Sequence, residues 1–182
     1  PRTSSAASDV YKRQEVNHAI LAKHTFEHEI AYAIANNVLG SIDVNRGDYL
    51  VGWDTDQFPN NVEELVLPFY YIFKNGGLGN GGLNMDAKVR RQSIDPEDLF
   101  YAHIGSMDTC ARALIAVEKM INDGSYDNFL QQRYQGWESN KELISSDSLD
   151  NIYQRVKSEN INPNPRSGRQ EYLENLINSF IE

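Results

Sequence analysis

The stretch Leu39-Gly-Ser-Ile-Asp-Val44 is a short apolar run with a carboxylate, Asp43, near its end. It predicts a short buried β-strand. Residues 22–38 before it carry apolar side chains at three- and four-residue steps and predict a helix that ends before Gly40. Similar short strands are expected to end near Glu15 and to cover residues 83–86. Strands that alternate with helices are typical of an α/β fold with a parallel sheet.

Two further helices are predicted from their starts. The first begins after Asn60 or Asn61 and runs to about Lys74, with acidic residues in its first turn and a kink expected at Pro68. The second begins at Asp95-Pro-Glu-Asp98 and runs to Asn122. Its apolar stripe is expected to comprise Leu99, Phe100, His103, Met107, Cys110, Leu114, Val117 and Ile121.

The segment Gly76-Gly-Leu-Gly-Asn-Gly-Gly82 contains the letters of a GxGxxG phosphate loop. Such a loop follows a strand and opens a helix, whereas this segment follows a helix and precedes a strand. A helix-to-strand connection is therefore the better interpretation.

The alternation of strands and helices ends at Gly124. Residues 125–182 predict short helices, one opening near Asp147 or Ser148 and one at the capping box Ser167-Gly-Arg-Gln170, with an extended linker over 162–166. This part is expected to be a helical oligomerisation arm that packs on another subunit.

Composition excludes several classes of protein. The chain has 182 residues, of which 40% are hydrophobic and 24% charged, and a net charge of −9, which argues against nucleic-acid or anionic-membrane partners. No apolar run approaches the roughly 18 residues of a membrane span. The one cysteine, Cys110, fits a reducing cytoplasm and a place in the core. Residues 1–14 match no element of the pattern and are interpreted as a non-native or disordered leader.

Six metal-binding side chains gather where the predicted strands end. They are Glu15, His18, Asp43, Asp54, Asp56 and Asp86. Taken singly, each could be a helix cap, a turn residue or part of a solvated loop. Side chains alternate along an extended segment, so the two aspartates of Asp54-Thr-Asp56 face one side. Converging carboxylates repel one another unless cations lie among them.

The predicted ligands also indicate the kind of metal. Oxygen ligands with one imidazole suit Mg²⁺, Mn²⁺ or Co²⁺ and do not suit a thiolate zinc site. Six ligands exceed what one small cation needs once substrate and water bind, so two cations that share a bridging carboxylate are expected.

A competing motif is His24-Thr-Phe-Glu27-His28, which matches the H-x-x-E-H pattern of inverted zinc peptidases. In that interpretation the two histidines hold zinc and Glu27 acts as general base. The alternative is a polar face of the first helix.

The chain also resembles a known family, xylose isomerase, in its longer-chain class. The resemblance is carried by Glu15-Val-Asn-His18, Gly40-Ser-Ile-Asp43, Gly52-Trp-Asp54-Thr-Asp56, Asn84-Met-Asp86, Asp98-Leu-Phe-Tyr-Ala-His-Ile-Gly105 and Ser167-Gly-Arg-Gln-Glu171. The motifs occur in order from about Glu15 to the end of the chain.

The resemblance implies the C-terminal portion of a (β/α)₈ TIM barrel, strands six to eight with their helices over 15–124, and a helical arm over 125–182 in a homotetramer. It implies an enzyme that converts D-xylose to D-xylulose, and D-glucose to D-fructose, by a metal-assisted 1,2-hydride shift. Glu15 would bridge two divalent cations, Asp43 and Asp86 would hold the first, and His18, Asp54 and Asp56 the second.

The chain departs from the family by lacking its first five strands and the histidine–aspartate pair that opens the sugar ring. It is therefore interpreted as a fragment that is inactive alone. A non-catalytic metal-binding or oligomerisation module is the alternative from another class of protein.

Overall fold

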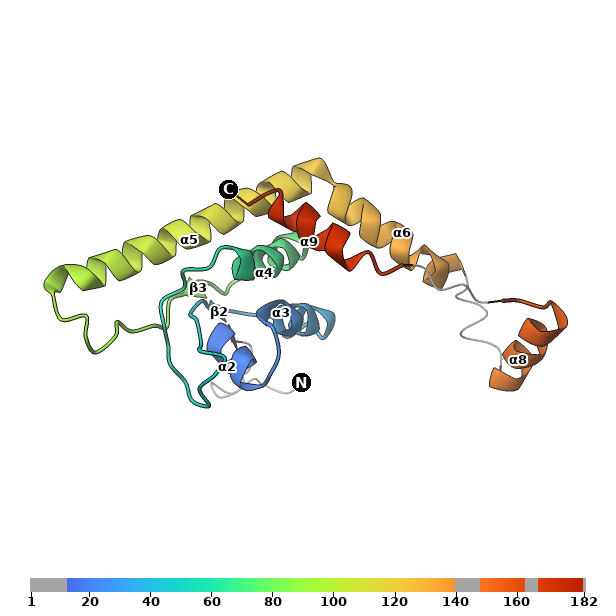
Figure 1. The fold of residues 1–182 in the computed structure, drawn as a ribbon, viewed down its shortest axis with the longest axis horizontal. Coiled ribbons are helices and arrows are strands. Elements are labelled where there is room, and N and C mark those ends of the chain that lie inside the picture. The colour runs from blue at the N-terminus through green and yellow to red at the C-terminus, as the bar shows by residue number, and fades with distance from the viewer. Residues whose placement is uncertain (1–12, 140–147, 163–166, 182) are drawn as a thin grey trace. The chain divides into compact units, whose positions relative to one another are not determined.

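The computed structural model describes residues 13–139, 148–162 and 167–181 (Figure 1). The chain divides into two compact units, Pro1–Lys119 with Phe180–Glu182 and Met120–Ser179. Residues 1–12 of the predicted leader and residues 163–166 of the predicted linker lie outside the described part. Within the described part, no helix combines the length and the apolar character needed to cross a bilayer.

The first unit is built on a three-stranded parallel sheet of order β1-β2-β3. Its strands are short, namely β1 (Gln14–Glu15), β2 (Ile42–Asp43) and β3 (Leu83–Asn84). The predicted parallel α/β arrangement is confirmed. Gln14, which was assigned to the leader, is instead part of β1 and pairs with Ile42.

Three helices surround this sheet: α2 (Val16–Leu21), α3 (Phe26–Ala35) and α4 (Glu63–Lys74) (Figure 1). The helix predicted over 22–38 is wrong at both ends. Lys23 adopts a left-handed conformation, with φ of 66°, which interrupts the helical conformation between α2 and α3. Thr25 then precedes the first residue of α3 in an extended conformation. Helix α4 ends at Lys74 as predicted and continues past Pro68, but Val62, and not the predicted Asn60 or Asn61, is the residue that directly precedes it.

The core of the first unit lies between α3, α4 and the sheet. Helix α3 packs on α4, and α2 packs on β1 and α3. Ile30 of α3, Val66 of α4 and Val44 after β2 are all completely buried. Burial of such side chains contributes about 1.5–3 kcal/mol each, so this core anchors the strand ends that carry the candidate ligands.

The glycine-rich segment connects α4 to β3, as predicted. Gly76 and Gly77 follow α4 with φ of 90°, a conformation that L side chains rarely adopt. Their role is therefore to turn the chain out of a helix, and the segment does not open a helix as a phosphate loop does.

Helix α5 (Pro96–Asp123) follows the predicted start and ends before Gly124. Its predicted apolar stripe is wrong at most positions of the N-terminal half and at Leu114, because Leu99, Phe100, Met107 and Leu114 are exposed. Cys110 is buried as predicted, and burial raises the pKa of its thiol to about 11.

The second unit contains α6 (Ser125–Ser139), α8 (Leu149–Ser158) and α9 (Gln170–Asn178), with no strand among its described residues. Helices α6 and α9 lie side by side, with the Phe129 and Tyr172 ring centroids 5.9 Å apart. Ser148 caps α8 by accepting from the Asn151 amide, as predicted.

The predicted capping box at α9 is wrong. Arg169, in a left-handed conformation with φ of 49°, precedes the helix, and the Ser167 hydroxyl accepts from the Arg169 amide. The serine therefore closes a local turn, and the helix begins at Gln170 without a side-chain cap.

Candidate metal centre

Acidic side chains meet at the carboxyl ends of the three parallel strands. The strands pair in register, so that Glu15 lies opposite Asp43 and Asp43 lies opposite Asn84. Asp86 follows two residues after β3. Because parallel strands end at one edge of a sheet, residues distant in sequence are brought to the same place.

One set of side chains, here called the carboxylate group, comprises Glu15, Asp43 and Asp86. One oxygen from each lies within 4.8 Å of the others. Glu15 and Asp43 are buried, whereas Asp86 is exposed. Three carboxylates at this spacing provide only oxygen ligands, which hard divalent cations prefer.

A second set, the histidine group, comprises Glu15, His18 and Asp54, again with one ligand atom from each within 4.8 Å of the others. His18 Nδ1 lies 3.1 Å from Glu15 Oε2, and His18 Nε2 lies 3.1 Å from Asp54 Oδ2. His18 reaches this place because α2 begins directly after β1. Glu15 is thus common to both groups.

Asp56, the sixth predicted ligand, belongs to neither group. Its Oδ2 accepts from Lys88 Nζ at 2.6 Å, and its backbone is left-handed, with φ of 42°. Contact with Asp54 and the Lys88 ammonium lower the pKa of Asp56. Asp56 therefore lies beside the histidine group as an ionised, lysine-paired carboxylate.

Asn45 is a residue of this centre that the sequence reasoning missed. Its Nδ2 donates to Glu15 Oε1 at 2.8 Å and to the backbone carbonyl of Asp86 at 3.0 Å. Its Oδ1 accepts from the backbone amide of Asn17 at 2.9 Å. The side chain is buried. From the segment that follows β2, Asn45 therefore holds the shared carboxylate in place. No signal in the chain marked it, because all three partners are distant in sequence.

The loop after β2 lies against this framework. A Cβ added to Gly47 would lie 2.1 Å from Asn17 Oδ1, so only glycine fits there. The close approach brings the loop over α2, where Asn17 is itself buried.

Arg13 was also missed, because it falls in the predicted leader. Its Nε lies 2.6 Å from Asp43 Oδ2 and its Nη2 lies 3.4 Å from Asp86 Oδ2. The positive charge of the guanidinium reduces the electrostatic repulsion among the three carboxylates of this group.

Burial and neighbouring charge perturb two of the shared carboxyl groups. Burial raises the pKa of Glu15, and the charges of Asp54 and Asp43 add to that effect against the hydrogen bond from Asn45. Burial and the neighbouring Asp56 raise the pKa of Asp54. Burial disfavours the ionised form of these carboxyl groups, and a bound cation would stabilise that form.

The residues of the carboxylate group fit a divalent cation on their own geometry. Asp43 is fully buried, and among the described residues its Oδ2 accepts no hydrogen bond of good geometry despite the nearby Arg13. The Arg13 guanidinium, with Nε 2.6 Å away, compensates the charge of this buried oxygen, and a divalent cation ligated by the oxygen would take over that role.

The H-x-x-E-H motif gives a third cluster. The predicted placement of both histidines on one helix is wrong, because His24 precedes α3 and only His28 lies on it, but their ring centroids are still 4.7 Å apart. The carboxylate that joins them is Glu29 and not Glu27.

Comparison with known proteins agrees with the predicted resemblance. Residues 130–181 match the XylA2 C-terminal domain family. The chain is 58% identical over 177 residues to a protein of Ruegeria sp. strain TM1040 named xylose isomerase, covering 96% of this chain and 41% of that protein. Proteins of the same name from Cereibacter sphaeroides and Brucella anthropi are 56% and 53% identical, each over 176 residues, 96% of this chain and 40% of theirs.

The chain therefore spans about two fifths of the length of these relatives. It is similar, over nearly all of its own length, to the C-terminal part of proteins named xylose isomerase.

Proposed function

We propose that this chain supplies the C-terminal metal-binding part of an aldose–ketose isomerase that converts D-xylose to D-xylulose. The observation that carries the proposal is the shared carboxylate Glu15, which joins two ligand groups at the ends of parallel strands. The catalytic residues of (β/α)₈ barrels lie at this end of the strands. The similarity to proteins named xylose isomerase supports the same reaction.

The two groups would hold two divalent cations, Mg²⁺, Mn²⁺ or Co²⁺, in a cytoplasmic enzyme. When bound, such cations polarise the oxygens of the sugar as Lewis acids and so assist the 1,2-hydride shift. Glu15 would contribute to both sites, Asp43 and Asp86 to one, and His18 and Asp54 to the other. Asn45 keeps the Glu15 carboxylate facing both groups.

Asp56 is proposed to complete the second site only when Lys88 releases it. In the structure the Lys88 ammonium donates a hydrogen bond to Asp56 Oδ2. A cation beside Asp54 would compete with this ammonium for the same carboxylate, and the low pKa of Asp56 keeps that carboxylate ionised and ready to bind.

Cation binding should weaken steeply on acidification. Glu15 and Asp54 have raised pKa values, so protons occupy them at higher pH than ordinary carboxyl groups, and a cation must displace those protons. As the pH falls through each raised pKa, we expect affinity for Mn²⁺ to drop by about tenfold per pH unit for each protonated ligand. Electron paramagnetic resonance of free Mn²⁺, recorded from about pH 7.5 down to about pH 4, measures this. Constant affinity over that range would contradict the assignment of these two ligands.

The proposed activity can be tested with a chimera. Residues 15–182 would replace the corresponding part of the Ruegeria sp. protein, which is 58% identical to this chain. We expect the chimera to convert D-xylose to D-xylulose with Mg²⁺ or Mn²⁺, and to lose this activity when Asp43 is replaced by asparagine. The separate 182-residue chain is the negative control, because it should not turn over xylose.

The control variant for the chimera is Glu63→Gln, which changes an exposed acid at the start of α4. It should leave turnover unchanged. A folded chimera that binds Mn²⁺ but has no isomerase activity would refute the proposed reaction and leave a metal-binding module as the better reading.

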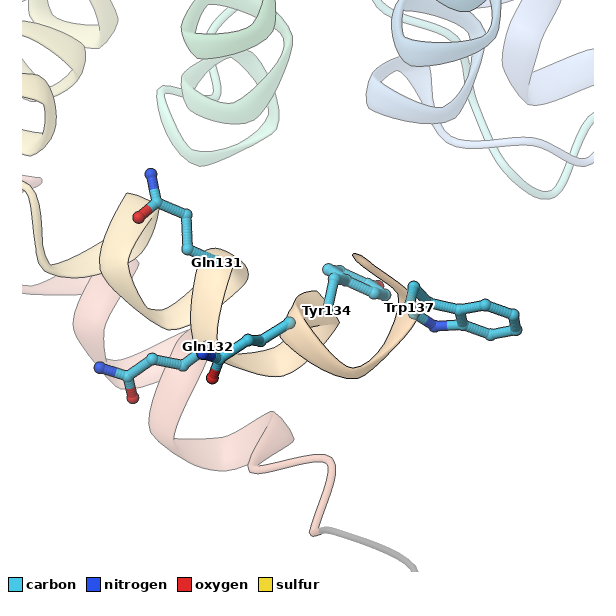
Figure 2. A pocket seen from close by; sticks show the side chains of 5 residues that line it. Gln131, Gln132, Tyr134 and Trp137 are labelled. Carbon is cyan, nitrogen blue, oxygen red and sulfur yellow. The ribbon is translucent and has the colours of Figure 1, made fainter. Parts of the chain in front are cut away.

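A second proposed property is assembly into a homotetramer through residues 125–182. Tyr134 and Trp137 project from α6 with more than half of each side chain exposed, and with Gln131, Gln132 and Gln135 they line a shallow pocket of about 620 Å³ (Figure 2). Large exposed aromatic side chains are typical of the centres of protein interfaces. This observation also favours the alternative of an oligomerisation module.

A further inference from the structure

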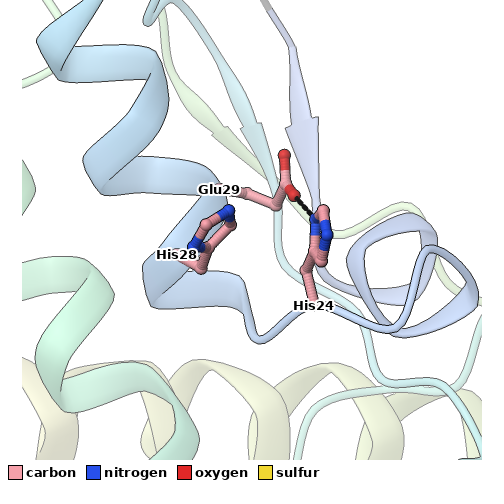
Figure 3. Close-up of side chains that lie close together, drawn as sticks. All are labelled: His24, His28 and Glu29. Atoms are coloured by element: carbon pink, nitrogen blue, oxygen red, sulfur yellow. Dashed lines mark hydrogen bonds and ion pairs between the residues drawn. The ribbon is translucent and has the colours of Figure 1, made fainter.

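The side chains of His24, His28 and Glu29 form a cluster outside the proposed isomerase centre (Figure 3). One ligand atom from each lies within 4.8 Å of the others. Figure 3 shows His28 and Glu29 on the first turns of α3 and His24 on the connection before that helix, with the three side chains facing one another. We propose that this cluster is a surface site for a borderline divalent transition ion, with Zn²⁺ as the representative.

The chemistry of the cluster differs from that of the isomerase centre. Two imidazoles and one carboxylate suit Zn²⁺, Cu²⁺ or Ni²⁺, whereas Mg²⁺ and Mn²⁺ prefer oxygen ligands. Histidine–histidine–glutamate is also a ligand set of zinc sites that keep a fourth position open. Ligand atoms about 2.1 Å from a tetrahedral zinc ion lie about 3.4 Å apart, so small side-chain rotations would close the cluster around the metal.

The backbone holds His24 in position for this role. The His24 amide donates to the Ala19 carbonyl at 2.9 Å, and the preceding Lys23 amide donates to the Ile20 carbonyl at 3.0 Å. With the left-handed Lys23, these bonds turn the chain from the end of α2 toward the start of α3. The position of His24 is thus set by the framework and not only by its side chain.

Neighbouring groups orient the two other ligands. The ring of His28 stacks on that of Tyr32, with an interplanar angle of 14° and centroids 6.4 Å apart. The carboxylate of Glu29 pairs with Nδ1 of His24, which leaves the other ring nitrogen available. His24 and Glu29 therefore already lie close enough to ligate one ion, which would replace their present contact.

Access also favours a metal ion from solution. His24 and His28 are exposed and Glu29 is half-buried, so an ion can enter without opening the core. A bound ion would tie the connection over residues 22–25 to α3, and would thereby stabilise the segment that links the two helices.

Zn²⁺ titration of the full chain by calorimetry tests the site. Because Zn²⁺ also binds carboxylates, the titration is done in a Glu15→Gln background that removes the ligand shared by the isomerase groups. We expect one Zn²⁺ per chain, and binding weakened by at least about tenfold in His24→Asn or His28→Gln. Glu29→Gln should weaken binding as well. Side-chain nitrogen resonances of His24 and His28 should shift on Zn²⁺ addition.

The matched control is Glu27→Gln, which changes the neighbouring acid of α3 that is outside the cluster. It should bind Zn²⁺ with unchanged affinity. The proposal is overturned if the Glu15→Gln chain binds no Zn²⁺, or if His24→Asn binds as tightly as its parent while far-ultraviolet circular dichroism shows both to be folded. Failure here leaves the isomerase proposal intact, because the two sites share no residue.

Discussion

Replacing Glu15 with glutamine should abolish the binding of both divalent cations and not of one alone. Glu15 is the only residue common to the carboxylate group and the histidine group among the described residues. The loss of an outer partner of a metal ligand already costs about 10- to 100-fold in affinity. The loss of a shared ligand should therefore exceed about a hundredfold at each site.

Glutamine is suited to this test because it preserves the framework. Its side-chain oxygen can still accept from Asn45 Nδ2, which now donates to Glu15 Oε1 at 2.8 Å. The variant should fold as the parent does, and the loss can then be assigned to the missing charge.

Calorimetric titration with Mn²⁺ measures the number of sites and their affinities. We expect two sites in the parent chain and none in Glu15→Gln. Asp86→Asn and Asp54→Asn should each remove one site and leave the other, because each residue belongs to one group. Glu63→Gln controls for the loss of one negative charge. A Glu15→Gln chain that keeps one tight site would refute the shared-ligand arrangement.

The sequence predicts that these carboxylates converge, because the signals for each strand and its carboxylate lie close together in the sequence. Each strand is an apolar run with a carboxylate close by, and parallel strands bring those carboxylates to one edge. Helices α4 and α5 were equally predictable, because acidic residues occupy the first turn of each. Such signals lie within a few residues of the element that they determine.

The failures have long-range or backbone causes. The apolar pattern over 22–38 has no mark for the left-handed Lys23 that separates α2 from α3. The stripe on α5 was predicted from periodicity alone, but periodicity identifies a face and does not say whether that face is covered. Leu99 and Phe100 belong to the predicted face, and in the structure both are exposed. Arg13 was excluded because a leader without pattern gives no hint of an ion pair with Asp43.

Replacing Asn45 with alanine should destabilise the first unit more than any other single polar change at the centre. The substitution removes the acceptor of the buried Asn17 amide and the donor to the buried Glu15 carboxylate. Each buried polar group left without a partner costs about 1–3 kcal/mol, so we expect a loss of about 2–5 kcal/mol in the free energy of unfolding. Urea denaturation followed by circular dichroism measures this loss.

The matched control is Asn36→Ala, which removes one exposed hydrogen bond, from Asn36 Nδ2 to the Tyr32 carbonyl at 2.8 Å. It should cost no more than about 1 kcal/mol, because water replaces the lost partner. Asn45→Ala should also weaken Mn²⁺ binding by about 10- to 100-fold, since Glu15 is no longer held toward both groups. Equal, small losses of stability in the two variants would mean that water reaches the Asn17 amide and the Glu15 carboxylate. The shared carboxylate would then be oriented by the cations themselves and not by the fold.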